Sequence, residues 1–194
     1  MTQLDVPAFK WGPQNRFYYR EGEEIGNFYG TRWASSCADL PDGTSCDQFQ
    51  VNDDGYLVYT GGNSFRDGIS SQLWGTSSEV NGTNYTWGMP FAAEGFAFIG
   101  NNQPDWNVNF STNFRYGGFT LYGLFSASLG YDLYNQTKQW AYREDRSGDG
   151  DQAGKAEGLK KPVSYYRALY NVNDGSGHFV EYGSYGKLRE LSLS

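Results

Sequence analysis

The feature that most constrains the fold is a pair of eleven-residue segments in which apolar and polar side chains alternate. Residues 106–116 place Trp, Val, Phe, Thr, Phe and Tyr at every second position, with Asn, Ser and Arg between them. Residues 119–129 alternate in a similar way. Because successive side chains of a strand point to opposite faces, each segment is predicted to be a strand with one apolar and one mostly polar face.

The link between these segments is Gly117-Gly118, which predicts a tight β-hairpin. A glycine pair readily supplies the positive φ angles of a two-residue hairpin turn. The expected register pairs Tyr116 with Phe119, Phe114 with Leu121 and Phe110 with Phe125. In this register the apolar faces of the two strands coincide.

The length of these strands raises the question of whether the hairpin lies in lipid or in water. Eleven residues is the length of a transmembrane β-strand. Tilted by about 40°, such a strand climbs about 25 Å, the height of the apolar band of an outer-membrane barrel. The polar face carries a single charge, Arg115. The alternative is a water-soluble β-sandwich, whose wet face usually carries Lys and Glu.

Composition favours many strands and turns and excludes some partners. The 194 residues include 16 Tyr, 13 Phe and 26 Gly, which suits strands and turns better than helical bundles. A net charge of −7 argues against a nucleic-acid partner, because nucleic-acid binding needs a basic face. The first residues do not resemble a signal peptide. We therefore expect either that an upstream part of the chain carried the export signal or that the membrane interpretation is wrong.

Cys37 and Cys46 enclose a short polar segment and are a candidate disulfide. In an exported protein this bond would close a short loop and stabilise the fold by about 2–3 kcal/mol on the chain-entropy model. The alternative is a pair of free thiols. Two cysteines and a single histidine make a poor zinc site, so no metal is expected there.

The rest of the chain predicts short strands, two helices and long loops. Residues 60–92 are rich in Gly, Ser, Asn and Thr and predict either a functional loop or a disordered one. The other predictions are a strand at 25–33, two short strands around an Asp-Gly turn at 49–59, a short helix at 131–144, a helix starting at Pro162 and the start of a strand within 179–194.

A series of motifs follows in order along residues 25–194. They include NFYG at 27–30, VNDDGY at 51–56, NQPDW at 102–106, FRYGGFTL at 114–121, GYDLYNQTKQW at 130–140, GDGDQAGK at 148–155, KPVSYY at 161–166, HFVE at 178–181 and GSYGKLRE at 183–190. Each motif alone is weak, but the ordered set resembles the C-terminal barrel region of SusC/RagA-type TonB-linked (TonB-dependent) outer-membrane transporters.

This resemblance implies a mainly β fold in which antiparallel strands form part of a transmembrane β-barrel, with long extracellular loops that contain short helices. Residues 1–194 would be one partial barrel domain, with the plug domain and the final strands absent. The implied location is the outer membrane of a Gram-negative bacterium.

The resemblance also implies a function, which is the binding and import of nutrients, commonly glycan or peptide oligomers. The implied partners are outer-membrane lipid, the TonB complex through a missing N-terminal part, and a surface-exposed substrate-binding lipoprotein. Neither enzymatic activity nor a cofactor is implied. The alternatives are a soluble secreted β-sandwich that binds carbohydrate and, less favoured, a secreted glycosidase-like enzyme.

Aromatic side chains in the predicted loops and helices are the candidate substrate-binding residues. They are Trp74, Trp87, Trp140 and Tyr142. Flat rings present apolar faces that stack on sugars or pack on peptides. The alternative, which we favour, is that these rings pack the loops against one another.

Other polar residues have a structural interpretation beside a functional one. Asp145, Asp149 and Asp151 form an oxygen cluster of the kind that calcium prefers, but they lack EF-hand spacing, so a solvated turn is favoured. His178 is the only histidine, and a structural role is favoured over general-base work. The adjacent acids Glu23-Glu24 and Asp53-Asp54 would suit glycoside hydrolysis only if a partner carboxylate lay across a cleft.

Overall fold

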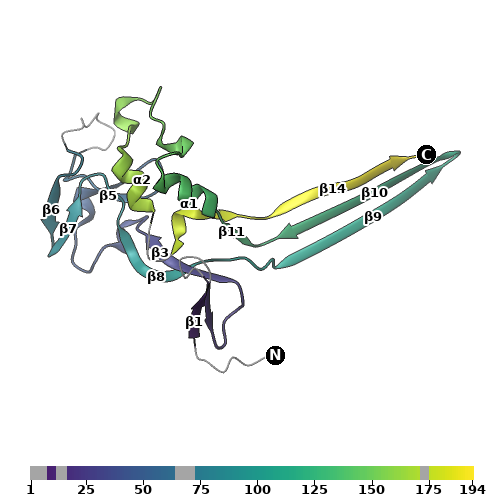
Figure 1. Cartoon of the computed structure of the whole chain (residues 1–194), viewed down its shortest axis with the longest axis horizontal. Helices are drawn as coiled ribbons and strands as arrows, with labels where there is room; N and C mark the ends of the chain where they lie inside the picture. The colour runs from purple at the N-terminus through teal and green to yellow at the C-terminus, as the bar shows by residue number, and fades with distance from the viewer. Residues whose placement is uncertain (1–7, 12–16, 64–72, 171–174) are drawn as a thin grey trace.

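The computed structural model describes residues 8–11, 17–63, 73–170 and 175–194. Over these ranges the chain is mainly β, with 46% strand and 18% helix, and most of its strand pairs are antiparallel. A compact part holds the helices and the short strands, and a long sheet projects from it (Figure 1). Every sheet formed by the described residues is open.

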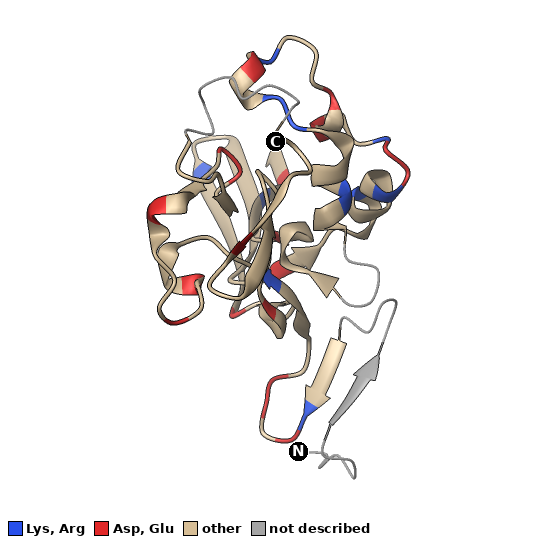
Figure 2. Cartoon of the chain, turned by 90° about the vertical axis from the view of Figure 1, so that its left-hand side faces the viewer, with Lys and Arg blue, Asp and Glu red and all other residues tan. Residues whose placement is uncertain are grey.

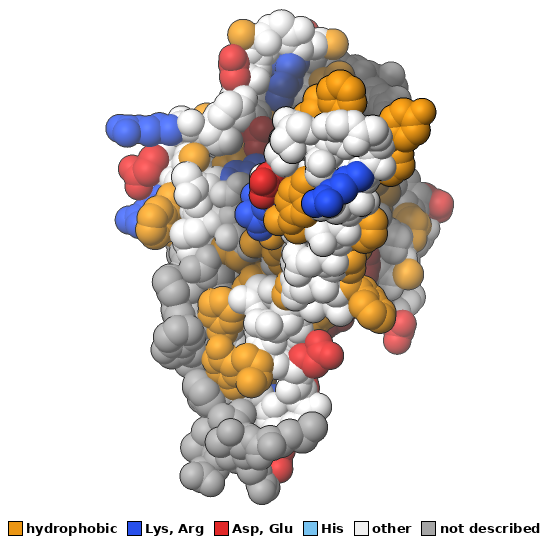
Figure 3. Space-filling view, turned by 90° about the vertical axis from the view of Figure 1, so that its right-hand side faces the viewer, with side chains coloured by type: hydrophobic (Ala, Val, Ile, Leu, Met, Phe, Trp, Pro, Cys, Tyr) orange, Lys and Arg blue, Asp and Glu red, His pale blue; other side chains and the backbone are white. Residues whose placement is uncertain are grey.

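The projecting sheet consists, within the described residues, of β9 (Trp106–Tyr116), β10 (Phe119–Leu129) and β14 (Tyr185–Leu193), in the order β14-β10-β9. The predicted register is confirmed, because Tyr116 pairs with Phe119 and Phe110 pairs with Phe125. The apolar side chains of β9 and β10 therefore share one face. Hydrophobic side chains are exposed when the molecule is seen from the side of the hairpin tip (Figure 3).

Strand β14 joins the apolar face through an irregularity in its register. Leu191 and Leu193 pair with Gly123 and Leu121, whereas Leu188 pairs with Phe125. Positions 188 and 191 have opposite parity, so a regular strand would place them on opposite faces. A register shift between Leu124 and Phe125 inserts one extra residue in β14, as a β-bulge does, and brings all three leucines to the same face.

The largest sheet of the compact part contains β1 (Ala8–Trp11), β2 (Phe17–Arg20), β3 (Asn27–Trp33), β8 (Ala92–Asn101) and β12 (Gly175–Ser176). β12 runs parallel to β3 and the other pairs are antiparallel. A Cβ atom at Gly30 would lie 2.1 Å from the carbonyl oxygen of Gly175, so this close approach requires glycine. The predicted strand at 25–33 is confirmed as β3.

Residues 49–59 form the predicted pair of short strands, β4 (Phe49–Val51) and β5 (Leu57–Tyr59). The prediction of a loop or disorder at 60–92 is wrong for much of that segment, although 64–72 lie outside the described residues. β6 (Ser77–Val80) and β7 (Thr83–Thr86) form a hairpin, and Tyr85 and Trp87 are buried. Burial in a shared core, rather than sequence periodicity, orders this stretch. That core also contains Ala34, Phe49, Leu57, Val58 and Tyr59.

The helix predicted at 131–144 is shorter than expected. β11 (Asp132–Tyr134) pairs with β13 (Val180–Tyr182), and α1 (Gln136–Arg143) begins only after them. Asn135 separates the two elements, because its side chain accepts a hydrogen bond from the Lys138 amide as an N-cap. The second predicted helix is α2 (Val163–Leu169), preceded by Pro162. A second core lies around the helices and contains Tyr142, Tyr165, Tyr166, Leu169 and Phe179.

The predicted disulfide is present between Cys37 and Cys46, whose Cα atoms lie 5.7 Å apart. The turn beside it is held by Asp39, which accepts hydrogen bonds from the Ser35 and Ser36 amides and pairs with Arg32 at 2.6 Å. The backbone bond from Ser35, then Arg32, lowers the pKa of Asp39. Acidic residues lie mostly on such turns and loops (Figure 2). Among the helices of the described residues, none is long and apolar enough to cross a membrane.

Candidate functional site

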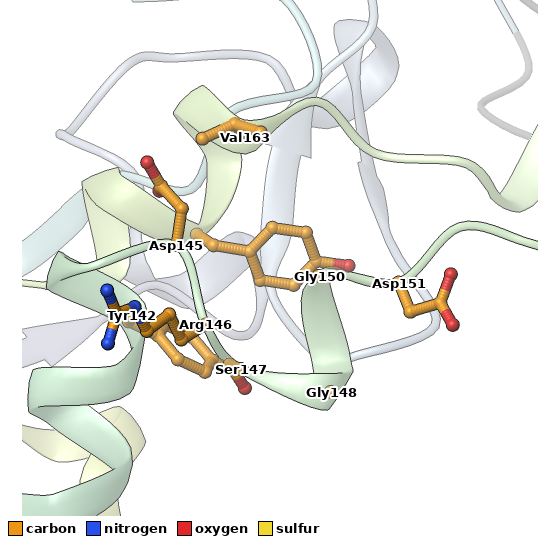
Figure 4. Close-up of a pocket in the computed structure, with 9 residues that line it drawn as sticks. Tyr142, Asp145, Arg146, Ser147, Gly148, Gly150, Asp151 and Val163 are labelled. Atoms are coloured by element: carbon orange, nitrogen blue, oxygen red, sulfur yellow. The ribbon is translucent and has the colours of Figure 1, made fainter.

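A cleft of about 340 Å³ opens on the compact part between α1, the loop that follows it and the start of α2. Its walls come from Tyr142 and the 145–151 loop on one side and from Val163 and Tyr166 on the other (Figure 4). Clefts of this size suit small ligands.

The 145–151 loop leaves α1 through a Schellman motif. Asp145 has a φ of 54°, the left-handed conformation that ends many helices. The Arg146 amide donates to the Ala141 carbonyl at 2.8 Å, and the Asp145 amide donates to the Tyr142 carbonyl at 3.3 Å. Aspartate tolerates this conformation better than most residues. The chain therefore turns sharply after the helix and forms one wall of the cleft.

A chain of hydrogen bonds lies beneath the cleft and joins segments that are distant in the sequence. The Tyr142 hydroxyl donates to Asp149 at 2.7 Å and lies 2.9 Å from Nε2 of His178. The Tyr56 hydroxyl lies 2.7 Å from Nδ1 of the same ring. Since Tyr142 already donates to Asp149, its oxygen accepts from Nε2–H, and Nδ1 accepts from Tyr56. His178 thus has a structural connecting role, as the sequence favoured.

The electrostatics of this chain keep its histidine neutral and its tyrosines protonated. Burial, and then the charge of Lys138, lowers the pKa of His178 to about 4. Burial, and then Asp54, raises the pKa of Tyr56 to about 12. Burial and the bond to Asp149 raise the pKa of Tyr142. A neutral, half-buried imidazole between two hydroxyl groups joins the loops without changing charge near neutral pH.

A second polar cluster holds the Asp53-Asp54 turn against α2. The Lys161 side chain is 2% exposed, pairs with Asp53 and donates to Asp54 at 2.8 Å. The Tyr165 hydroxyl donates to Asp54 at 2.7 Å. Burial opposes ionisation of Asp54, but the bonds from Lys161 and Tyr165 outweigh it and lower the pKa of Asp54. These two acids therefore neutralise a buried lysine. The other adjacent pair, Glu23-Glu24, lies away from the cleft, and Glu23 pairs with Arg20.

The acidic residues of the 145–151 loop are held by separate partners. Asp145 forms a bidentate ion pair with Arg167, in which Nε lies 3.1 Å from Oδ1. Asp149 accepts from Tyr142 and lies 3.5 Å from the Lys138 ammonium. Within the described ranges, no group of three or more metal-ligating side chains is gathered. Asp145 and Asp149 are therefore each engaged by a neighbouring basic side chain.

The structure does not gather the four predicted binding aromatics into one site. Trp87 is 3% exposed, and its ring centroid lies 5.1 Å from that of Trp74. Tyr142 is 2% exposed, although its ring lines the cleft. Trp140 is exposed but does not line the cleft. Trp87 and Tyr142 are therefore too buried to present a ring face for stacking, and the favoured alternative, packing between loops, describes Trp74, Trp87 and Tyr142.

Most residues of the cleft could not be singled out from the sequence. Arg146 belongs to no recognisable motif, and it meets Val163 and Tyr166 of the KPVSYY motif only because α2 packs beside α1. The helix predicted to start at Pro162 is a usable signal, because α2 carries Val163 and Tyr166. The turn that ends α1 has Asp145 at the position where glycine is usual, so the sequence gives no glycine signal for the end of this helix.

Comparisons with known proteins give no further information on the site. The chain matches no protein-family model, no curated protein and no solved structure.

Proposed function

We propose that this chain is part of the barrel of an outer-membrane TonB-dependent transporter of the SusC/RagA type. In this proposal it contacts outer-membrane lipid, binds glycan or peptide oligomers outside the cell and takes part in their import. One observation carries the proposal, namely the long apolar face of the projecting sheet, which no other layer of the described chain covers.

The exposure of this face is large for a protein in water. Phe110, Phe114 and Leu188 are each more than half exposed, and Phe125 is 44% exposed. Exposed apolar patches of this kind mark contacts with another protein or with a membrane. Aromatic side chains occupy both ends of the face, with Trp106 at one end and Tyr116 at the other. Interfacial aromatic belts have this placement.

The opposite face of the projecting sheet suits a water-filled interior. It carries amide and hydroxyl side chains that bond to one another, as Ser128 does to Asn107 at 2.8 Å. Arg189 donates to Ser126 at 2.7 Å on the same sheet. The strands thus combine an apolar outer face with a polar inner face, as strands of a transmembrane barrel do.

The edges of the projecting sheet indicate that further strands complete it. Within the described residues, β9 and β14 each pair only with β10. Lipid cannot satisfy the backbone groups of an open edge, so only closed barrels span membranes. We therefore propose that strands outside the described residues close the barrel on both sides.

The ends of the projecting sheet suggest its orientation. Outer-membrane barrels have short periplasmic turns and long extracellular loops. The Gly117-Gly118 turn lies at one end and the compact part at the other (Figure 1). In this proposal the projecting sheet lies in the outer membrane of a Gram-negative bacterium, and the compact part lies outside the cell. The Cys37–Cys46 disulfide is in keeping with an oxidising compartment.

The remaining partners follow from the family resemblance. Import would draw energy from the TonB complex, contacted by an N-terminal part of the transporter. A surface-exposed substrate-binding lipoprotein would work with the extracellular side. The competing interpretation, a soluble carbohydrate-binding sandwich, needs a second sheet over Phe110 and Phe125. Among the described strands, none packs there, since both rings are exposed.

Vesicle flotation with a pair of arginine variants tests the proposal. The open edges of the projecting sheet keep the chain alone from spanning lipid, so we expect it to bind the surface of phospholipid vesicles through its apolar face and to float with them. Phe110→Arg should lower the floated fraction, because it places a charged side chain on the face that contacts lipid. Asn109→Arg, on the opposite face, is the matched control and should float like the parent chain. Equal behaviour of the two variants, or a chain that stays in the aqueous fraction, would contradict the proposal.

A further inference from the structure

We propose that the cleft between α1 and α2 binds a small zwitterionic ligand, of the size of a dipeptide. The ammonium group would lie at Asp151 and the carboxylate at Arg146. This inference names a ligand class for the proposed substrate-binding role and rests on that role. It does not depend on lipid contact by the projecting sheet.

The charges at the cleft carry the inference. Asp145 is neutralised by Arg167, and Asp149 is held by Tyr142 and Lys138. Arg146 has no hydrogen-bond or ion-pair partner for its guanidinium group among the described residues. Asp151 accepts a bond from the Ala153 amide at one carboxylate oxygen and makes no ion pair within the same part of the chain. The cleft therefore presents one positive and one negative group that its own residues do not pair.

The positions of these two groups match a ligand with separated opposite charges. Arg146 and Asp151 both line the cleft and lie on opposite sides of the view in Figure 4, with Val163, a third lining residue, above them. Guanidinium groups bind carboxylates with two parallel hydrogen bonds, and carboxylates accept from ammonium groups. An anion alone would leave Asp151 without a counter-charge, and a neutral sugar would leave both groups without one.

The walls between the charged groups suit a short apolar body. Val163 is 52% exposed, and the Tyr142 and Tyr166 rings meet edge to face at 5.5 Å. At Gly148 and Gly150 no atom lies within 4 Å of a Cβ position, so this side of the loop is open. The absence of side chains there leaves room for a ligand beside the loop.

The loop that carries the charges is already held in place. Ser147 accepts from the Asp149 amide at 3.2 Å, and Gln152 donates to the Tyr166 hydroxyl at 3.1 Å. Tyr142 fixes Asp149 from below. A site that is ordered before binding loses less conformational entropy on binding.

Titration calorimetry on the full chain with defined dipeptides tests the inference. L-alanyl-L-leucine should bind, and its N-acetyl derivative and its C-terminal amide should each bind about tenfold more weakly, because each lacks one charge. Arg146→Gln should remove the difference between the free dipeptide and the amide. Asp151→Asn should remove the difference between the free dipeptide and the N-acetyl derivative.

Controls separate this inference from general effects of charge. Arg143→Gln removes an exposed arginine outside the cleft and should leave binding unchanged, and Gly148→Val should block the cleft and abolish binding. Binding of maltose but not of the dipeptide would overturn the ligand class while leaving substrate binding intact. No binding of the dipeptide by a chain that floats with vesicles would overturn the inference alone. Loss of flotation with dipeptide binding retained would overturn only the membrane part of the proposed function.

Discussion

At the scale of single residues, His178 shows how a side chain without a catalytic motif becomes central to the packing of the compact part. Its two ring nitrogens meet Tyr56 and Tyr142, which lie 122 and 36 residues away in the sequence. The sequence favoured a structural role because no nucleophile motif accompanied the histidine. It could not identify the partners, because only tertiary packing brings these three rings together.

The titration of His178 is a direct prediction. The burial that lowers its pKa from 6.5 to about 4 favours the neutral ring in the folded chain. Between these pH values the unfolded chain binds a proton that the folded chain does not. The contribution of His178 to the free energy of unfolding should therefore be full above pH 6.5. It should fall by up to about 3 kcal/mol as the pH drops towards 4. Because the chain has one histidine, its imidazole NMR signals report this pKa without assignment.

The control for this prediction is His178→Gln. This variant should lose the fall in stability between pH 6.5 and 4, measured by thermal melting. It should keep the fall at lower pH, where Asp39, Asp54 and Asp149 take up protons, because their pKa values are lowered in the folded chain. A measured histidine pKa near 6.5 would contradict the desolvation of His178 in the folded chain.

At the scale of elements, local patterns were predicted and long-range ones were not. The register of β9 and β10 follows from alternation and a two-residue turn, which are local signals. The strand at 132–134 was mistaken for helix because its partner, 180–182, lies far along the chain. The hairpin at 77–86 was missed because its stability comes from Tyr85 packing on Phe49, not from periodicity. The cleft was missed because its residues also come together only through tertiary packing.

The hairpin turn gives a prediction at this scale. Gly117 has a φ of 58°, whereas Gly118 has no left-handed φ, as in a turn that needs glycine at its first central position only. Neither position has an atom within 4 Å of a Cβ, so only backbone strain distinguishes them. Gly117→Ala should destabilise the chain by about 1 kcal/mol. Gly118→Ala should be neutral or stabilise it by about 0.5 kcal/mol. Denaturant unfolding measures both, and equal effects would contradict the turn geometry.

At the scale of the whole molecule, a compact part and a projecting sheet have different sources of stability. The compact part has its own buried clusters, and Tyr56 and Trp74 pack against both of them. The projecting sheet leaves its apolar side chains exposed, and in the proposed function outer-membrane lipid covers them. The sequence predicted this apolar face, but it could not predict how the loops pack into a compact part.

The account depends most directly on which face of the projecting sheet contacts lipid. Spin labels on cysteines report this, because oxygen concentrates in lipid and a nickel chelate stays in water. Val108→Cys, Phe110→Cys and Phe125→Cys test the apolar face, and Asn107→Cys, Asn109→Cys and Ser126→Cys test the polar face. The native cysteines are already bonded to each other. In the vesicle-bound chain, we expect the labels at 108, 110 and 125 to be exposed to oxygen and those at 107, 109 and 126 to the chelate. Equal exposure of both faces to the chelate would contradict the account.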